Sequence, residues 1–194
     1  MKYKEKIINY LEKSGGIITS KYCVLNEIPS VYLTRLVRDN ILKKISQGIY
    51  VTENADFDEL YFFQLRYKKT IFSYYTALYL LGLSDKIIQN IDVTVESGYK
   101  FNEIMPNVNI KYVKKSLFKL GVIEVETMFG NKVRTYCFER IICDFIKNKN
   151  NIDIEIYAKI IRKYINYKNK NLELLYEIAS KMGILKEVME IYYE

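Results

Sequence analysis

The chain has 194 residues, 49% of them hydrophobic, which is enough to bury one large core or two small ones. It contains no histidine, which excludes Ser-His-Asp and Cys-His catalysis and argues against a conventional zinc enzyme. Its net charge is +7, and residues 1–52 carry nine lysines and arginines against four acidic residues, a net charge of +5. Such a basic N-terminal segment is typical of a nucleic-acid binder, although a lysine-rich composition alone would give a similar excess.

The N-terminal quarter of the chain follows the element order of a winged helix-turn-helix. Gly15 and Gly16 end the first amphipathic segment, Thr19 is an N-cap, Ser30 caps a further helix after the break at Pro29, and Gly48 marks a hairpin turn. The predicted elements are a helix over 2–14, a strand at 17–18, a helix over about 20–26, a helix from 31 to about 40, and strands over 42–45 and 49–52.

The helix that begins at Val31 has an apolar and a polar face. At about 100° per residue, Leu33, Leu36 and Val37 fall on one side and should face a core. The other side and its flanks carry our candidate DNA contacts, which are Ser30, Val31, Tyr32, Thr34, Arg35 and Arg38. Arginine on such a helix contacts guanine and valine packs on a thymine methyl group. The serine at the N-terminus suits a phosphate.

The hairpin that follows should lie beside this helix and reach the neighbouring DNA backbone or minor groove. Its candidate contacts are Lys43, Lys44, Ser46 and Gln47. Because element order, caps, turn and polar face agree, we expect a DNA-binding winged helix-turn-helix domain over residues 1–55. A winged helix that serves only as a protein-interaction module stays open as an alternative.

The remaining residues, 56–194, are predicted to form a mixed α/β domain after an acidic connector at 53–58. The expected elements are helices over 60–66 and 73–81, strands over 92–96 and 108–114, a hairpin of strands over 122–128 and 132–138, and helical segments over the last 55 residues. The overall class is therefore α+β, with a small β-sheet of four or more strands and a helical C-terminal part.

Three chemistries were considered for this second domain. Asp92, Glu96 and Lys100 have the residue types of a restriction-type nuclease, but three residues separate the glutamate from the lysine where that motif has one. No phosphate-binding glycine loop occurs. For general acid–base chemistry, the spacing of Arg140 and Asp144 indicates an ordinary i, i+4 helix ion pair instead. We therefore expect no enzyme, no catalytic residues, no metal and no cofactor. A metal-dependent nuclease with a winged-helix targeting domain stays open as an alternative.

Cysteine usage and hydropathy bear on the compartment. No apolar run of 18 residues occurs, so no transmembrane helix and no membrane partner are expected, and the charged N-terminus is unlike a signal peptide. The three cysteines, Cys23, Cys137 and Cys143, are odd in number and lack CxxC spacing. This favours buried, reduced thiols in a cytoplasmic protein over a disulfide framework.

Four segments of the chain resemble the AbiEi family of abortive-infection antitoxins, which belong to bacterial type IV toxin–antitoxin systems. They are IINYLEKSGGIITSKYCVLNEIPSVYLTRLVRDNILKKISQGIYV, FQLRYKKTIFSYYTALYLLGLSD, IDVTVESGYK and YCFERIICD. Residues 72–78 read FSYYTAL where the family's common form is FSHETAL, so a histidine and a glutamate are missing.

The resemblance implies a transcriptional autorepressor that binds inverted repeats in the double-stranded DNA of its own promoter. It also implies that the second domain counteracts a partner toxin, AbiEii, a nucleotidyltransferase-like enzyme that uses a nucleoside triphosphate. By position, the implied DNA contacts are Ser30, Tyr32, Thr34, Arg35 and Arg38 on the recognition helix, with residues 43–47 in the wing.

Overall fold

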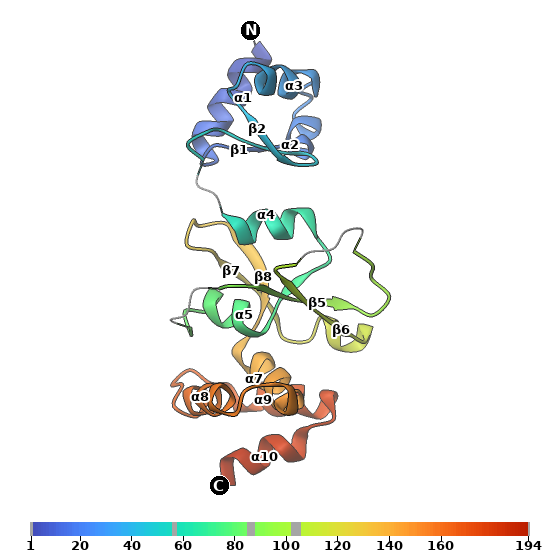
Figure 1. The fold of residues 1–194 in the computed structure, drawn as a ribbon, viewed down its shortest axis with the longest axis vertical. Coiled ribbons are helices and arrows are strands. Elements are labelled where there is room, and N and C mark those ends of the chain that lie inside the picture. Colours follow the sequence, from blue (N-terminus) through green and yellow to red (C-terminus); the bar gives the residue numbers. More distant parts are fainter. Residues whose placement is uncertain (1, 56–57, 85–87, 102–105, 194) are drawn as a thin grey trace. The chain divides into compact units, whose positions relative to one another are not determined.

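The computed structural model describes residues 2–55, 58–84, 88–101 and 106–193 (Figure 1). Contacts divide the chain into two compact units, Met1–Glu59 and Leu60–Glu194, which we call the N-terminal and C-terminal units. Each unit contains helices and a β-sheet, so the α+β class predicted from the sequence is confirmed. No helix in the described ranges is long and apolar enough to cross a membrane.

The N-terminal unit has the element order that the sequence predicts. Its elements are α1 (Lys2–Lys13), β1 (Ile17–Thr19), α2 (Ser20–Leu25), α3 (Val31–Arg38), β2 (Lys43–Ser46) and β3 (Ile49–Val51). The three strands form an antiparallel sheet in the order β1-β3-β2, in which Ile17 of β1 and Lys43 of β2 both pair with Val51. The short first strand therefore extends the predicted hairpin into a three-stranded sheet.

All three helices of this unit end in the same hydrogen-bonded turn. Gly15, Glu27 and Asn40 adopt left-handed backbone conformations, with φ of 64°, 56° and 55°. The amide that follows each one donates to a carbonyl five residues earlier, as Ile41 does to Leu36 at 2.9 Å. This is the Schellman arrangement. It ends α3 at Arg38, two residues before the end predicted from the sequence.

The two predicted caps have different outcomes. The Thr19 side chain accepts a hydrogen bond from the Tyr22 amide at 3.1 Å, so this N-cap is confirmed. The prediction that Ser30 caps α3 is wrong, because its side chain makes no capping hydrogen bond. Its backbone is already helical (φ −59°, ψ −23°), since the turn starts at Pro29, whose carbonyl accepts from the Tyr32 amide at 3.1 Å.

The C-terminal unit contains a mixed five-stranded sheet in the order β6-β5-β4-β8-β7. Its strands are β4 (Ile71–Phe72), β5 (Ile91–Glu96), β6 (Val108–Val113), β7 (Val122–Glu126) and β8 (Lys132–Tyr136). Its helices are α4 (Glu59–Arg66), α5 (Tyr74–Leu80), α6 (Lys115–Phe118), α7 (Phe138–Lys147), the 3₁₀ turn η1 (Lys149–Asn151), α8 (Ile154–Ile165), α9 (Leu172–Met182) and α10 (Leu185–Tyr193).

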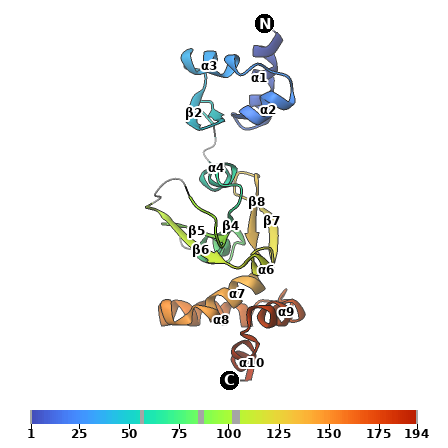
Figure 2. The same cartoon turned by 90° about the vertical axis from the view of Figure 1, so that its right-hand side faces the viewer.

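Helices lie on both sides of this sheet. In two perpendicular views α4 runs along one side, while α7 to α10 gather on the other (Figures 1 and 2). Phe72, Val93 and Val133 are fully or almost fully buried within the sheet layer. A larger core surrounds α7, where Ile141 and Phe145 are completely buried together with Leu175 and Ile178 of α9.

The central strand β4 is absent from the sequence-based prediction, which places only a link before residue 73. Ile71 and Phe72 are both buried, so the strand shows none of the alternation that marks a half-exposed strand. The side chain of Gln64 on α4 supports this region. It accepts from the Arg134 amide at 2.6 Å and donates to the Arg134 carbonyl at 2.9 Å, as a neighbouring strand would.

The three cysteines are free and buried, as the sequence predicts. Burial raises the pKa of the Cys137 thiol to about 11 and that of Cys143 to about 12. Both groups are therefore protonated near neutral pH, and a protonated thiol is a poor nucleophile.

Candidate nucleic-acid interface

The exposed face of α3 carries the first group of candidate contacts. Leu33 and Leu36 are almost completely buried, whereas four residues at i, i+3, i+4 and i+7 spacing are exposed, which are Val31, Thr34, Arg35 and Arg38. The division into faces predicted from the sequence is therefore confirmed. Ser30, at the start of the helix, is also exposed. A helix of this length spans about 12 Å, similar to the width of the DNA major groove.

The charges on this face differ in how they are held. The Nε atom of Arg38 lies 3.4 Å from a carboxylate oxygen of Asp39, and both side chains are largely exposed. Arg35 forms no ion pair within the described residues, and its guanidinium carbon lies 5.4 Å from the centre of the Tyr32 ring. Arg35 is therefore the arginine whose charge is less compensated by a neighbouring carboxylate.

Tyr32 occupies a different position from the other predicted contacts. It is half-buried, and its ring centre lies 5.3 Å from that of Tyr3 on α1. The ring lies between Tyr3 of α1 and the Arg35 guanidinium, so the structure places Tyr32 against another candidate contact residue and leaves less of its own side chain exposed. Sequence reasoning missed Tyr3, because a tyrosine in the first turn of an amphipathic helix carries no local signal of its partner.

The hairpin presents the second group of candidate contacts immediately after α3. Lys43 and Lys44 on the edge strand β2 are exposed, as is Gln47 in the turn, while Ser46 is half-buried. Gly48 has a φ of 78°, which glycine adopts without strain, and its carbonyl accepts from the Ser20 amide at 2.8 Å. This bond fixes the tip of the hairpin to the start of α2.

The nuclease motif considered from the sequence does not converge in the C-terminal unit. Asp92 is buried, and its two carboxylate oxygens accept from the Asn109 side chain at 2.9 Å and from the Tyr75 amide at 3.1 Å. Burial raises the pKa of Asp92 above its ordinary value, and these hydrogen bonds oppose that shift without cancelling it. Glu96 lies four residues along the same strand, about 13 Å away. Asp92 therefore ties β5 to β6 and α5, and the two carboxylates are too far apart to share one ion.

Arg140 and Asp144 do not form the ordinary helix ion pair expected from their spacing, because both side chains are buried. The Arg140 Nε atom donates to both carboxylate oxygens at 3.2 Å, and its Nη1 atom donates to the carbonyls of Leu117 and Leu120 at 2.6 and 2.8 Å. All residues from Phe138 to Ile146 are buried. Four of the ten residues of α7 are charged, as on a surface helix, so its own sequence carries no signal of this burial.

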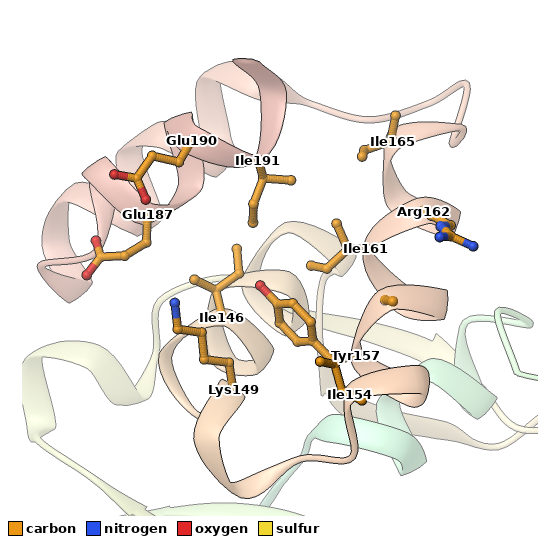
Figure 3. Close-up of a pocket in the computed structure, with 11 residues that line it drawn as sticks. Ile146, Lys149, Ile154, Tyr157, Ile161, Arg162, Ile165, Glu187, Glu190 and Ile191 are labelled. Carbon is orange, nitrogen blue, oxygen red and sulfur yellow. The ribbon is translucent and has the colours of Figure 1, made fainter. Parts of the chain in front are cut away.

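A groove of about 480 Å³ lies among α7, α8 and α10 (Figure 3). Ile146, Ile161 and Ile191 point toward its centre, where the Tyr157 hydroxyl also lies, while Glu187 and Glu190 stand on α10 and Arg162 points away. Among the described lining residues, the charged groups lie at the rims and do not converge on one point. The groove therefore has the character of an apolar surface rather than of a site for acid–base chemistry.

Comparison with models of known protein families gives no match to this chain, and comparison with curated proteins gives none either.

Proposed function

We propose that this protein is a transcriptional autorepressor and an antitoxin, in which the N-terminal unit is a winged helix-turn-helix that binds double-stranded DNA. The target would be inverted repeats in its own promoter. The observation that carries the DNA-binding proposal is the exposed face of α3, with Val31, Thr34, Arg35 and Arg38 at helical spacing above a buried Leu33 and Leu36.

In this proposal α3 enters the major groove and the hairpin follows the flanking backbone. Arg35 reads guanine through a bidentate hydrogen bond, and Val31 packs on a thymine methyl group. Lys43 and Lys44, which form no ion pair within the described residues, neutralise phosphates. The exposed Ser30 adds a phosphate contact at the helix N-terminus.

The antitoxin half of the proposal rests on the resemblance to AbiEi antitoxins. The C-terminal unit would counteract a nucleotidyltransferase-like toxin whose gene lies next to that of this protein. Tyr74 and Tyr75 stand where the family's common form has a histidine and a glutamate. Tyr74 is buried, whereas Tyr75 is 38% exposed and meets Asp92 only through its backbone amide, so the histidine and glutamate chemistry of the family's form is absent from both positions.

Fluorescence anisotropy with the DNA upstream of the gene tests the DNA-binding half. Arg35→Ala should weaken binding by ~1–3 kcal/mol and relax base preference at one position. Arg35→Lys keeps the charge but loses the bidentate fork, so it should lose the base preference with little change in salt dependence. Lys43→Ala should weaken binding to all sequences and lower the salt slope by about 1.

Arg162→Ala is the matched control, because it removes an exposed arginine from α8 of the C-terminal unit. It should leave promoter binding unchanged. Equal binding of promoter DNA and a scrambled duplex by the wild-type protein, at near-physiological salt, would contradict the DNA-binding proposal.

Co-expression with the neighbouring toxin gene separates the two halves. The full-length double variant Arg35→Ala and Arg38→Ala should rescue growth as well as the wild-type protein does, while a promoter–reporter fusion becomes derepressed. If the wild-type protein rescues growth but neither protein represses the reporter, the winged helix serves protein interaction instead. If the wild-type protein does not rescue growth, the antitoxin proposal is wrong.

A further inference from the structure

The C-terminal unit contains a second hollow, separate from the groove of Figure 3, that we call the basic cavity. Its volume is about 520 Å³. It lies where the end of β6, the start of α6, the middle and end of α7 and the end of α9 meet Tyr74 at the start of α5. The charged residues that line it are Lys111, Lys114, Arg140, Asp144, Lys147 and Lys181.

The described lining residues therefore include five basic side chains and one acidic side chain. Lys181 is paired with Glu177 at 2.5 Å, and Lys147 donates to the Met182 carbonyl at 3.1 Å. Lys111 and Lys114 are exposed and form no ion pair within the described residues. Lys111 interacts electrostatically with the buried Asp92, whereas no carboxylate pairs with Lys114 within the described residues. The excess of basic over acidic side chains around the cavity attracts anions.

Arg140 adds a cation that is already desolvated. Its side chain is completely buried, and its Nε and Nη1 atoms are occupied by Asp144 and by two carbonyls. Its Nη2 atom, which carries two N–H donors, has no hydrogen-bond partner among the described residues. The guanidinium carbon lies 4.2 Å from the centre of the Tyr136 ring, which covers one face of the group. Because buried donors in proteins are almost always paired, the Nη2 donors are available to an acceptor in the cavity.

Tyr74 shows a third feature that points to the same cavity. It is not glycine, yet its φ is 45°, and such strained conformations cluster at ligand sites. Its hydroxyl oxygen accepts from Asn148 at 2.6 Å, which leaves its own O–H proton free to donate. The amine of Lys111 lies 5.7 Å from the centre of the Tyr74 ring.

We propose that the basic cavity binds a phosphorylated small molecule, with its phosphate held by Arg140, Lys111 and Lys114. A bare phosphate would fill only part of a cavity of about 520 Å³, which lies within the usual range of about 300–1,000 Å³ for organic ligands. Arginine and lysine are the usual phosphate partners, and the exposed side chain of Tyr112, which also lines the cavity, offers apolar surface for the rest of the ligand. This site is independent of the DNA-binding proposal.

Isothermal titration calorimetry of the full chain in a phosphate-free buffer tests the site, with AMP, adenosine and inorganic phosphate as probes. AMP should bind at one site per chain, phosphate should compete with it more weakly, and adenosine should not bind. Lys111→Glu combined with Lys114→Glu should weaken AMP binding by about tenfold or more, because two attractive charges become repulsive.

Lys115→Glu combined with Lys119→Glu is the matched control. Both lysines are exposed neighbours that do not line the cavity, so AMP affinity should change by less than about twofold. Arg140→Lys is the direct variant, and circular dichroism must first show that it folds. Loss of AMP binding to the same extent in both double variants, or no binding of AMP and phosphate to the wild-type protein, overturns the proposal.

A DNA phosphate could offer the same chemistry, so one arm of the experiment adds saturating promoter duplex. AMP affinity should not change. If the duplex displaces AMP from both the wild-type protein and the Arg35→Ala variant, the cavity takes a DNA phosphate and the small-molecule proposal is wrong.

Discussion

The Nε atom of Arg140 lies 3.2 Å from both carboxylate oxygens of Asp144, and both side chains are buried within the C-terminal unit. Lys181 and Glu177 have the same i, i+4 relationship on α9, yet their side chains are 55% and 52% exposed. The two pairs are alike in spacing along a helix and opposite in environment. Their contributions to stability should therefore differ strongly.

Removing one partner of the buried pair should destabilise the protein far more than removing one partner of the exposed pair. Asp144→Ala should lower the free energy of unfolding by ~3–5 kcal/mol, because it leaves the Nε atom of a buried cation without an acceptor and opens a cavity beside it. Glu177→Gln should change it by about 0.5 kcal/mol or less. Urea denaturation measures both values. Equal small effects would mean that solvent reaches Arg140 in solution.

The same pair gives a prediction about pH. Burial raises the pKa of Asp144 from 3.8 to about 6, and the nearby Arg140 charge opposes this shift without cancelling it. Between about pH 4 and pH 6 the folded protein then binds more protons at this residue than the unfolded chain does. The contribution of Asp144 to stability is therefore fully present below about pH 4 and is lost as the pH rises to about 6.

Asp144→Asn removes this titration and provides the comparison. The stability of the wild-type protein relative to the variant should fall between pH 4 and pH 6 and stay level above that range. Chemical denaturation at several pH values measures the difference. An increase over the same interval would show that Arg140 holds the pKa of Asp144 below its ordinary value.

Thr19 and Ser30 form a matched pair for the role of helix caps. Thr19→Ala should lower the free energy of unfolding by ~0.5–2 kcal/mol, because the Tyr22 amide loses its acceptor. Ser30→Ala should change it by about 0.5 kcal/mol or less, since this exposed side chain makes no capping bond. Thermal unfolding of both variants checks the order. A larger effect at Ser30 would restore the cap that the sequence predicts.

Gly121 and Gly130 share a left-handed backbone, with φ of 75° and 77°, but differ in their surroundings. A Cβ atom at Gly121 would lie 2.7 Å from the Cβ atom of Arg140, whereas one at Gly130 would meet nothing within 4 Å. Gly130→Ala should therefore cost only the backbone strain, ~1–2 kcal/mol. Gly121→Ala should cost at least ~1–3 kcal/mol more, because it also overpacks the core. Similar melting temperatures for the two variants would contradict this.

Local sequence signals were sufficient to predict the order and most boundaries of the helices and strands in the N-terminal unit. Gly15, Thr19 and Gly48 each mark an element boundary through their own backbone or hydrogen-bonding preference, and the structure places a boundary at each. The exposed face of α3 followed from helical periodicity alone. Ser30 failed as a cap because the residue before it, Pro29, starts the helical turn earlier, which the presence of a serine does not reveal.

Features that depend on distant residues could not be read from the sequence. The strand Ile71–Phe72 exists because β5 and β8 lie on its two sides, and a two-residue segment has no periodicity of its own. The burial of Arg140 depends on carbonyls that lie 20 and 23 residues earlier in the chain. The basic cavity gathers Tyr74, Lys111 and Lys181 from separate segments, and none of them is unusual within its own stretch of sequence.

The short central strand also bears on how the C-terminal unit folds. β5 pairs with β6, and β7 pairs with β8, over five or six residues each. β4 joins these two halves through the shorter pairing of Ile71 and Phe72, which the bond from the Ser73 amide to the Asp92 carbonyl extends toward β5. The hydrogen bond between Thr135 and Phe72 spans 63 residues, so the pairing of β4 with β8 should form late in folding, after each half of the sheet has formed. In the native state the pairing of β4 with its two neighbours should be the first part of the sheet to break. Amide hydrogens of β5 and β8 that face β4 should then exchange with solvent faster than those that face β6 and β7.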